Sequence, residues 1–136
     1  MPLLSRKGIL AIAAVIDVAL NSQARPVSAK ALASRHGLPP RHLEPVLQAL
    51  VHEGILRGVR GPRGGYELGR GPDSITANEI LRAAGTVDDQ NESHMPGSPI
   101  IGEVVLPALV QAERAFADAL STIHLKELVS KAEKTA

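Results

Sequence analysis

The residues of this chain best suited to chemistry are arginines and glycines in one short stretch. Gly54–Tyr66 reads GILRGVRGPRGGY, so Arg57, Arg60 and Arg63 recur every third residue among five glycines. Guanidinium groups bind phosphates and base edges, and glycines let a backbone approach a phosphate or a groove wall closely. The spacing matches neither the phosphate loop of nucleotide hydrolases nor the dinucleotide-binding glycine motif. The stretch therefore predicts contact with nucleic acid rather than nucleotide chemistry.

Other reactive groups are scarce. The chain has no cysteine, which excludes disulfides, thiolate zinc sites, a cysteine nucleophile and an all-cysteine iron–sulfur cluster. His36, His42 and His52 lack the spacing of metal ligands, and neither a G-x-S-x-G nor an H-E-x-x-H motif is present. We therefore do not expect an enzyme.

Charge is divided unevenly along the 136 residues, a length typical of one domain. Residues 1–72 hold ten Lys/Arg against four Asp/Glu, a net charge of +6, while residues 73–136 hold five against ten, a net charge of −5. A basic half suits a nucleic-acid surface. Phe116 and Tyr66 are the only aromatic residues, so the chain has little on which to stack single-stranded bases, and the core must be aliphatic.

Two short helices must precede and position the arginine-rich stretch. Ser28 is a suitable N-cap for a helix over 29–36, and Gly37 is suited to end it in a left-handed conformation. A second helix starts at Pro39-Pro40 and closes at Gly54. Its apolar residues recur at helical spacing: Leu43, Val46, Leu47, Leu50 and Val51. This is the pattern of a helix-turn-helix, whose second helix enters the major groove of DNA.

The arginine-rich stretch itself has the pattern of a β-hairpin. Two β-capable runs, 55–60 and 66–68, flank the turn 61–65. A hairpin directly after a helix-turn-helix is a wing. The predicted fold is therefore mainly α with a small β-hairpin wing, a winged helix-turn-helix followed by a long dimerisation helix.

The N-terminal region has two interpretations. An apolar run over 9–20 after Arg6-Lys7 imitates a signal peptide, yet helical spacing equally predicts a buried helix over about 5–21. Asp17 interrupts the run, which is also too short to span a membrane. We expect the buried helix, with no membrane association and a cytoplasmic location.

The second half contains a further helix and an acidic linker. Thr76 and Glu79 form a T-x-x-E capping box that predicts a helix over 77–84. Residues 86–99 are polar, acidic and contain Pro and Gly, which predicts a loop.

A long helix over 100–122 and a last one over 125–134 complete the chain. The long helix carries an apolar stripe: Ile101, Val105, Ala108, Ala112, Phe116 and Ala119. A second copy of the chain is the simplest cover for the stripe, and packing back on its own domain is the alternative. We therefore expect a DNA-binding domain (1–86), an acidic linker or effector loop (87–99) and a dimerisation unit (100–136).

Several segments together resemble one family. The wing resembles the pattern G-(I/L)-(L/V)-x-x-V-R-G-P-x-G-G-Y-x-L of the Rrf-type winged-helix transcriptional regulators, which include iron–sulfur-biogenesis, nitric-oxide-sensing and cysteine-metabolism regulators. The opening Leu4-Ser5-Arg6-Lys7-Gly8 and the helix from Val27-Ser28 to Gly37-Leu38 are also similar to family segments. The resemblance covers about residues 3–86 and, more loosely, the C-terminal helices.

This resemblance implies a homodimer that binds double-stranded operator DNA, and we expect a repressor. It implies that Glu44 reads bases and that Arg60 enters the minor groove, both reasonable for a carboxylate facing cytosine and a guanidinium in a narrow groove. Arg41 and His42 lie in the first turn of the predicted recognition helix. Further expected DNA contacts are Ser28, Arg63 and Gly64. The alternative function is a winged-helix adaptor that binds protein without specific DNA binding.

The chain departs from the family in its sensor region. Iron–sulfur members carry three cysteines in the region that corresponds to 88–105, and this chain has none, so we expect no cofactor. His94 is the only nitrogen ligand of that loop. Metal binding by His94 with nearby carboxylates stays open, as does an effector or partner protein at 87–99; the carboxylates are Asp88, Asp89 and Glu92.

Overall fold

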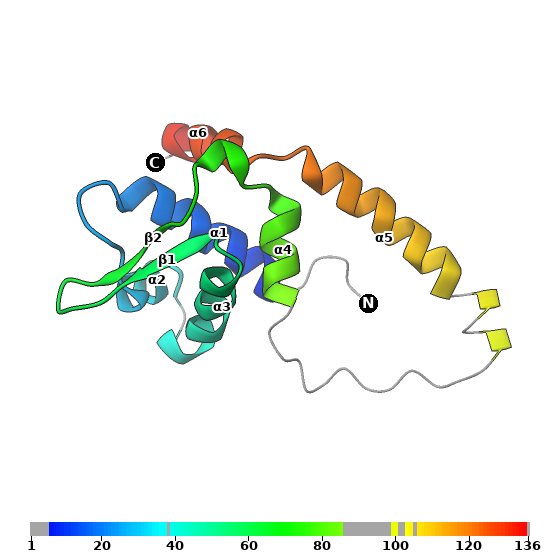
Figure 1. Cartoon of the computed structure of the whole chain (residues 1–136), viewed down its shortest axis with the longest axis horizontal. Helices are drawn as coiled ribbons and strands as arrows, with labels where there is room; N and C mark the ends of the chain where they lie inside the picture. Colours follow the sequence, from blue (N-terminus) through cyan, green and yellow to red (C-terminus); the bar gives the residue numbers. More distant parts are fainter. Residues whose placement is uncertain (1–5, 38, 86–98, 101–102, 105, 136) are drawn as a thin grey trace.

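In a computed structural model, a winged body carries one long helix that projects from it (Figure 1). The structure describes residues 6–37, 39–85, 99–100, 103–104 and 106–135. The elements, in chain order, are α1 (Arg6–Asn21), α2 (Ala29–Arg35), α3 (Pro40–His52), β1 (Leu56–Val59), β2 (Gly65–Leu68), η1 (Pro72–Ser74), α4 (Ala77–Gly85), α5 (Leu106–Ser121) and α6 (Leu125–Thr135).

Local signals explain where the helices begin and end. Ser28 Oγ accepts a hydrogen bond from the Ala31 amide at 3.0 Å, and Gly37 has a φ of 65°, so both predicted caps of α2 are confirmed. Glu79 N donates to Thr76 Oγ1 at 3.2 Å and Thr76 N donates to a Glu79 carboxylate oxygen at 3.1 Å. The predicted capping box therefore begins α4.

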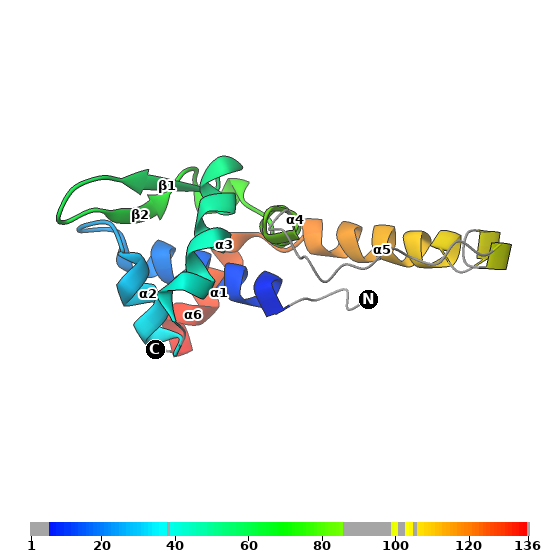
Figure 2. The same cartoon turned by 90° about the horizontal axis from the view of Figure 1, so that it is seen from below.

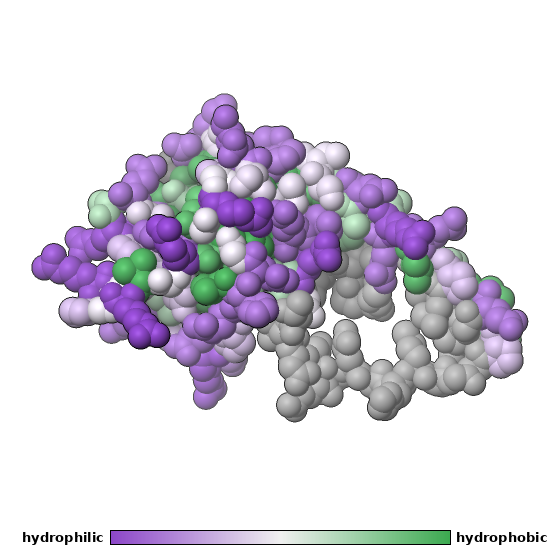
Figure 3. Space-filling view, viewed as in Figure 1, coloured by the Kyte–Doolittle hydropathy of each residue, from purple (hydrophilic) through white to green (hydrophobic). Residues whose placement is uncertain are grey.

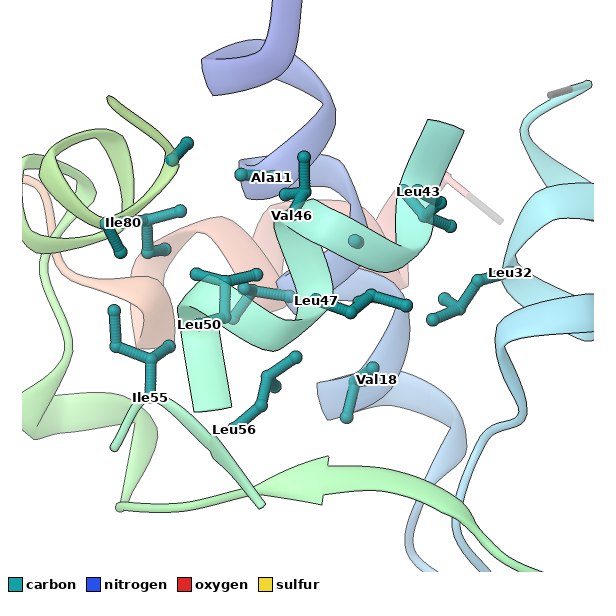
Figure 4. Close-up of a cluster of buried hydrophobic side chains, with 14 of the residues drawn as sticks. Ala11, Val18, Leu32, Leu43, Val46, Leu47, Leu50, Ile55, Leu56 and Ile80 are labelled. Carbon is teal, nitrogen blue, oxygen red and sulfur yellow. The ribbon is translucent and has the colours of Figure 1, made fainter. Parts of the chain in front are cut away.

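The core lies where α1, α2, α3 and α4 converge, and its buried side chains are aliphatic, as predicted (Figure 4). Of the predicted inner face of α3, Leu43, Val46, Leu47 and Leu50 are buried and Val51 is partly buried. Pro45 lies on the exposed face, and α3 continues beyond it to His52. The buried residues labelled in the close-up are Ala11, Val18, Leu32, Leu43, Val46, Leu47, Leu50, Ile55, Leu56 and Ile80.

The wing is an antiparallel hairpin that is hydrogen-bonded to the α1–α2 linker. β1 pairs with β2 in the register Leu56↔Leu68 to Val59↔Gly65. Val27 exchanges two backbone hydrogen bonds with Tyr66, of 2.8 and 2.7 Å, and so forms an isolated antiparallel β-bridge beside the two-stranded sheet. A side chain at residue 65 would collide with the Val27 carbonyl, which explains the glycine there.

α6 folds back onto the winged body. Leu125 N donates to Ile75 O at 2.8 Å and Ala77 N donates to Ile123 O at 2.9 Å, and the Leu125 side chain is fully buried. α6 then packs against α1. The sequence predicted this helix within 100–136 but carried no signal of the surface on which it packs.

α5 instead extends away from the body in both views (Figures 1 and 2), and its principal neighbour is α4. Hydrophobic side chains lie between hydrophilic ones on its surface (Figure 3). Of the predicted stripe, Ala108, Ala112 and Ala119 are exposed and Phe116 is half-buried, while Ile101 and Val105 lie outside the described residues. Among the described residues, no helix has the length and apolarity that crossing a membrane requires.

Candidate nucleic-acid interface

The first two turns of α3 present polar side chains to solvent. Leu43 faces the core, and its neighbours Arg41, His42 and Glu44 are exposed. The helical repeat separates the two sets, because residues three or four apart share a face. The predicted recognition residues therefore form an accessible surface at the start of α3.

The arginines on and next to the wing fall into two groups. Arg57 Nε donates to Glu67 Oε1 at 2.8 Å across the strands, and Arg70 lies 3.3 Å from a carboxylate oxygen of Glu79. By contrast, Arg60 and Arg63 are exposed at the tip and form no ion pair with any residue that the structure describes. The tip therefore carries two cations that no described side chain neutralises.

Glycines make the tip tight. Gly64 N donates to Gly61 O at 2.9 Å, and Gly61 has a φ of 114°, a conformation that side chains disfavour. A Cβ at residue 64 would overlap the Val59 carbonyl oxygen. The predicted site residue Gly64 thus has a structural role in the turn, and its contact with DNA stays a prediction.

Two grooves flank the wing. The first, of about 430 Å³, lies between α3 and the hairpin, with Gln48 and Arg60 among its lining residues, and Gln48 Nε2 donates to the Tyr66 hydroxyl at 3.3 Å. The second, of about 420 Å³, brings together Ser28, Arg63 and Gly64. The structure thus gathers three of the predicted site residues in one groove, places Arg60 in the other, and keeps Arg41, His42 and Glu44 on α3.

A buried carboxylate that the sequence analysis treated only as an interruption organises the helix-turn-helix. Asp17 is 6% exposed and accepts hydrogen bonds from Arg35 Nε at 2.8 Å and Nη2 at 2.6 Å. Asn21 Nδ2 donates to its Oδ1, and His36 Nε2 lies 3.0 Å from its Oδ2. The cluster joins α1 to the end of α2, directly before the turn that leads into α3.

The environment of Asp17 explains its ionisation. Burial alone raises the pKa of a carboxyl group, but the hydrogen bonds from Arg35 and Asn21, with the charges of Arg35 and His36, outweigh it. The net effect lowers the pKa of Asp17 from its ordinary value of 3.8. The same hydrogen bond raises the pKa of Arg35. In the sequence, the only signal of this cluster is one acidic residue, Asp17, within the apolar run of α1.

Within the described part of the chain, no three His, Cys, Asp or Glu side chains gather to hold a metal ion. His94, Asp88, Asp89 and Glu92, with nearly all of the 87–99 loop, lie outside the described residues. Because the chain has no cysteine, its donor set does not fit a thiolate-bound iron–sulfur cluster.

Comparison with known proteins agrees with this architecture. Residues 4–131 match the family model Rrf2, described as "Iron-dependent Transcriptional regulator". The HTH-type transcriptional regulator IscR of Escherichia coli K12 is 33% identical over 132 residues, which span 96% of this chain and 82% of the relative.

Solved structures show the same fold. T. potens IscR has a TM-score of 0.73 and 27% identity, over 97% of this chain and 89% of the other. The global cysteine regulator CymR of B. subtilis has a TM-score of 0.71 and 28% identity, over 94% and 96%. The winged helix fold and the exclusion of an enzyme are both supported by these matches, and the chain belongs to the Rrf2 family of DNA-binding transcriptional regulators.

Proposed function

We propose that this protein is a homodimeric, sequence-specific repressor that places α3 in the major groove of double-stranded DNA and the wing in the adjacent minor groove. The observation that carries the proposal is the groove that α3 and the wing share, bordered by Arg60, which has no ion-pair partner among the described residues. A helix with exposed polar side chains and an adjacent cationic hairpin match the two grooves of a duplex.

Each proposed contact has a defined chemistry. The Glu44 carboxylate accepts a hydrogen bond from the exocyclic amine of a cytosine, while Arg60 enters a narrow, negative minor groove. Arg41 and His42 reach base edges or phosphates from the first turn of α3. Contacts with the DNA phosphate backbone are made by the residues at the second groove, Ser28, Arg63 and Gly64.

The projecting α5 supports the homodimer. Of the predicted stripe, Ala108, Ala112 and Ala119 are exposed and Phe116 is half-buried, so the small apolar face of α5 is open to solvent. Pairing of two α5 helices about a twofold axis would cover this surface, with Phe116 and Ala119 in the seam. The remaining stripe residues, Ile101 and Val105, precede α5 and lie outside the described residues. The dimer would present two α3 helices about 34 Å apart, one turn of DNA.

Repression is the outcome that we propose, because a dimer bound over a promoter excludes the polymerase from it. The protein would act in the cytoplasm, where bacterial DNA lies. In vitro transcription from a promoter with the bound site tests the sign of regulation: fewer transcripts are expected, and an increase would make the protein an activator.

Selection of bound duplexes from a random pool tests DNA recognition. We expect a pseudo-palindromic site whose affinity falls steeply with salt, since phosphate contacts release counterions. Glu44→Ala should relax base preference at one position in each half-site, at a cost of about 1–3 kcal/mol of discrimination. A wild-type protein with no affinity for any duplex at low salt would contradict the proposal and favour the protein-binding adaptor.

Point substitutions test the dimer better than truncation after Ala84, because truncation also removes the buried Leu125 from the winged core. Ala112→Glu should give a monomer in sedimentation velocity, because it places a charged residue on the exposed apolar stripe at the proposed seam. Lys126→Glu, on the exposed face of α6, is the control that should remain dimeric. A folded, dimeric Ala112→Glu variant would place the interface elsewhere.

A further inference from the structure

The groove between the wing tip and the start of α2 is lined by three arginines that come from three separate segments of the chain. Arg25 comes from the α1–α2 linker, Arg35 from the end of α2 and Arg63 from the tip of the wing. The linker runs beside the wing in both views (Figures 1 and 2). No acidic residue is among those that line the groove, whose volume is about 420 Å³.

Backbone and side-chain contacts hold the three arginine-bearing segments in place. The two hydrogen bonds between Val27 and Tyr66 fasten the linker to the wing, and so fix the segment of Arg25 relative to that of Arg63. On the other side of the groove, Asp17 engages Arg35 through Nε and Nη2, which leaves Nη1 without a partner among the described residues. Arg25 and Arg63 are exposed and make no ion pair within the described part of the chain.

Guanidinium groups are strong hydrogen-bond donors to phosphate oxygens, and three of them line this one open groove. A carboxylate presents two oxygens in one plane, whereas a phosphate presents oxygens in several directions and can be approached by arginines from three segments at once. Asn21 and Ser28 add polar side chains to the same wall.

We propose that this groove is a phosphate-binding site formed by Arg25, Arg35 and Arg63. We assign the phosphate to a phosphodiester of the operator strand beside the wing, and this assignment rests on the proposed function. A free phosphorylated molecule offers the same chemistry, and the experiment below separates the two sources. In the DNA complex, the site ties the helix-turn-helix and the wing to one point on the backbone, and so sets how far the wing tip reaches into the minor groove.

The DNA arm uses the full-length Arg25→Gln and Arg63→Gln variants, both at exposed positions. Each should weaken binding to specific and to random duplexes by the same factor, about 3–10-fold, because phosphate contacts carry no base information. Each should also reduce the slope of log K against log salt concentration by about one. The double variant should lose little more slope than either single variant, since both arginines meet the same phosphate.

Arg57→Gln is the matched control, because it removes the same charge from the same hairpin but from a guanidinium that Glu67 already engages. Arg35 is left unchanged, since its replacement would leave the buried Asp17 without its main partner. Variants in the groove whose affinity and salt slope equal those of Arg57→Gln would overturn the DNA source.

The second arm measures binding of inorganic phosphate to the DNA-free protein by ³¹P NMR titration. Phosphate binding that disappears in the Arg25→Gln/Arg63→Gln double variant, with DNA binding equal to that of the control, would support a phosphate site that takes a free ligand. No effect in either arm would overturn the site itself. If the wild-type protein binds no DNA, the proposed function fails, and the phosphate titration alone then decides for or against the groove.

Discussion

Two regions of the winged body use arginine in different ways. Asp17–Arg35, Arg57–Glu67 and Arg70–Glu79 are ion pairs at joints between elements: α1 with α2, strand with strand, and the end of the wing with α4. Around the wing tip, Arg25, Arg60 and Arg63 have no ion-pair partner among the described residues. Arginine side chains therefore stabilise the fold in the first region and are available to bind an external anion in the second. Substitutions should therefore separate stability from binding.

Asp17→Ala should have the largest effect, and the effect should be on stability. It removes the acceptor for Arg35, His36 and Asn21 from a buried position and leaves a cavity. Hydrogen bonds to charged groups contribute about 1.5–3 kcal/mol each, but Arg35 is half-exposed and recovers water, so we expect a loss of about 2–3 kcal/mol in the free energy of unfolding. Urea denaturation followed by circular dichroism provides the measurement.

Asp17→Asn is the companion variant, since it keeps the size and a hydrogen-bond acceptor while removing the charge. Its loss should be smaller than that of Asp17→Ala but clearly measurable. If both variants unfold at the wild-type urea concentration, the cluster does not hold α1 to α2, and the distinction between paired and unpaired arginines loses its basis.

Arg60→Ala should have the next largest effect, and the effect should be on binding alone. The side chain is exposed and has no ion-pair partner in the described part of the chain, so its loss should leave the unfolding midpoint unchanged. DNA affinity should fall about tenfold or more, equivalent to about 1.4 kcal/mol. Fluorescence anisotropy with the selected duplex measures this, with Arg57→Ala as the control expected within about twofold of wild type. Equal losses in both variants would mean that ion pairing does not distinguish the two arginines.

The sequence could predict those features that depend on near neighbours. Ser28 and its target amide lie three residues apart, as do Thr76 and Glu79, and a helix turn brings such residues together whatever the rest of the chain does. The inner face of α3 follows equally from a repeat within one helix.

Features that depend on distant partners could not be predicted. Asp17 and Arg35 are 18 residues apart and meet only once α1 and α2 pack. Arg57 pairs with Glu67 because the strand register puts them opposite each other, and the alignment of two short runs does not reveal the register. For the same reason, the gathering of Arg25 and Arg63 at one groove and the packing of α6 on α1 emerged only from the structure.

Acid should weaken the paired region in a way that identifies Asp17. Its pKa in the folded protein is lowered below the ordinary 3.8, so the ionised carboxylate contributes stability that is fully present above the unfolded pKa. That contribution is lost as pH falls from about 4 through the folded pKa. Urea midpoints between pH 6 and pH 2 should show the wild-type advantage over Asp17→Asn shrinking at the acid end. A pH-independent difference would show that the charge of Asp17 contributes nothing.

Among the ion pairs, the loss of Arg57–Glu67 in Glu67→Ala should have the smallest effect on the free energy of unfolding. The Arg57–Glu67 pair lies on the wing with the Arg57 side chain largely exposed, and pairs of this kind contribute about 0.2–1 kcal/mol. The variant also releases Arg57 as a free cation close to the tip. We therefore expect a free energy of unfolding within about 1 kcal/mol of wild type, together with a slightly higher affinity for random duplex DNA at low salt. Unchanged or weaker duplex binding would show that a cation at this position on the wing does not reach the DNA, and would confine the binding region to the tip.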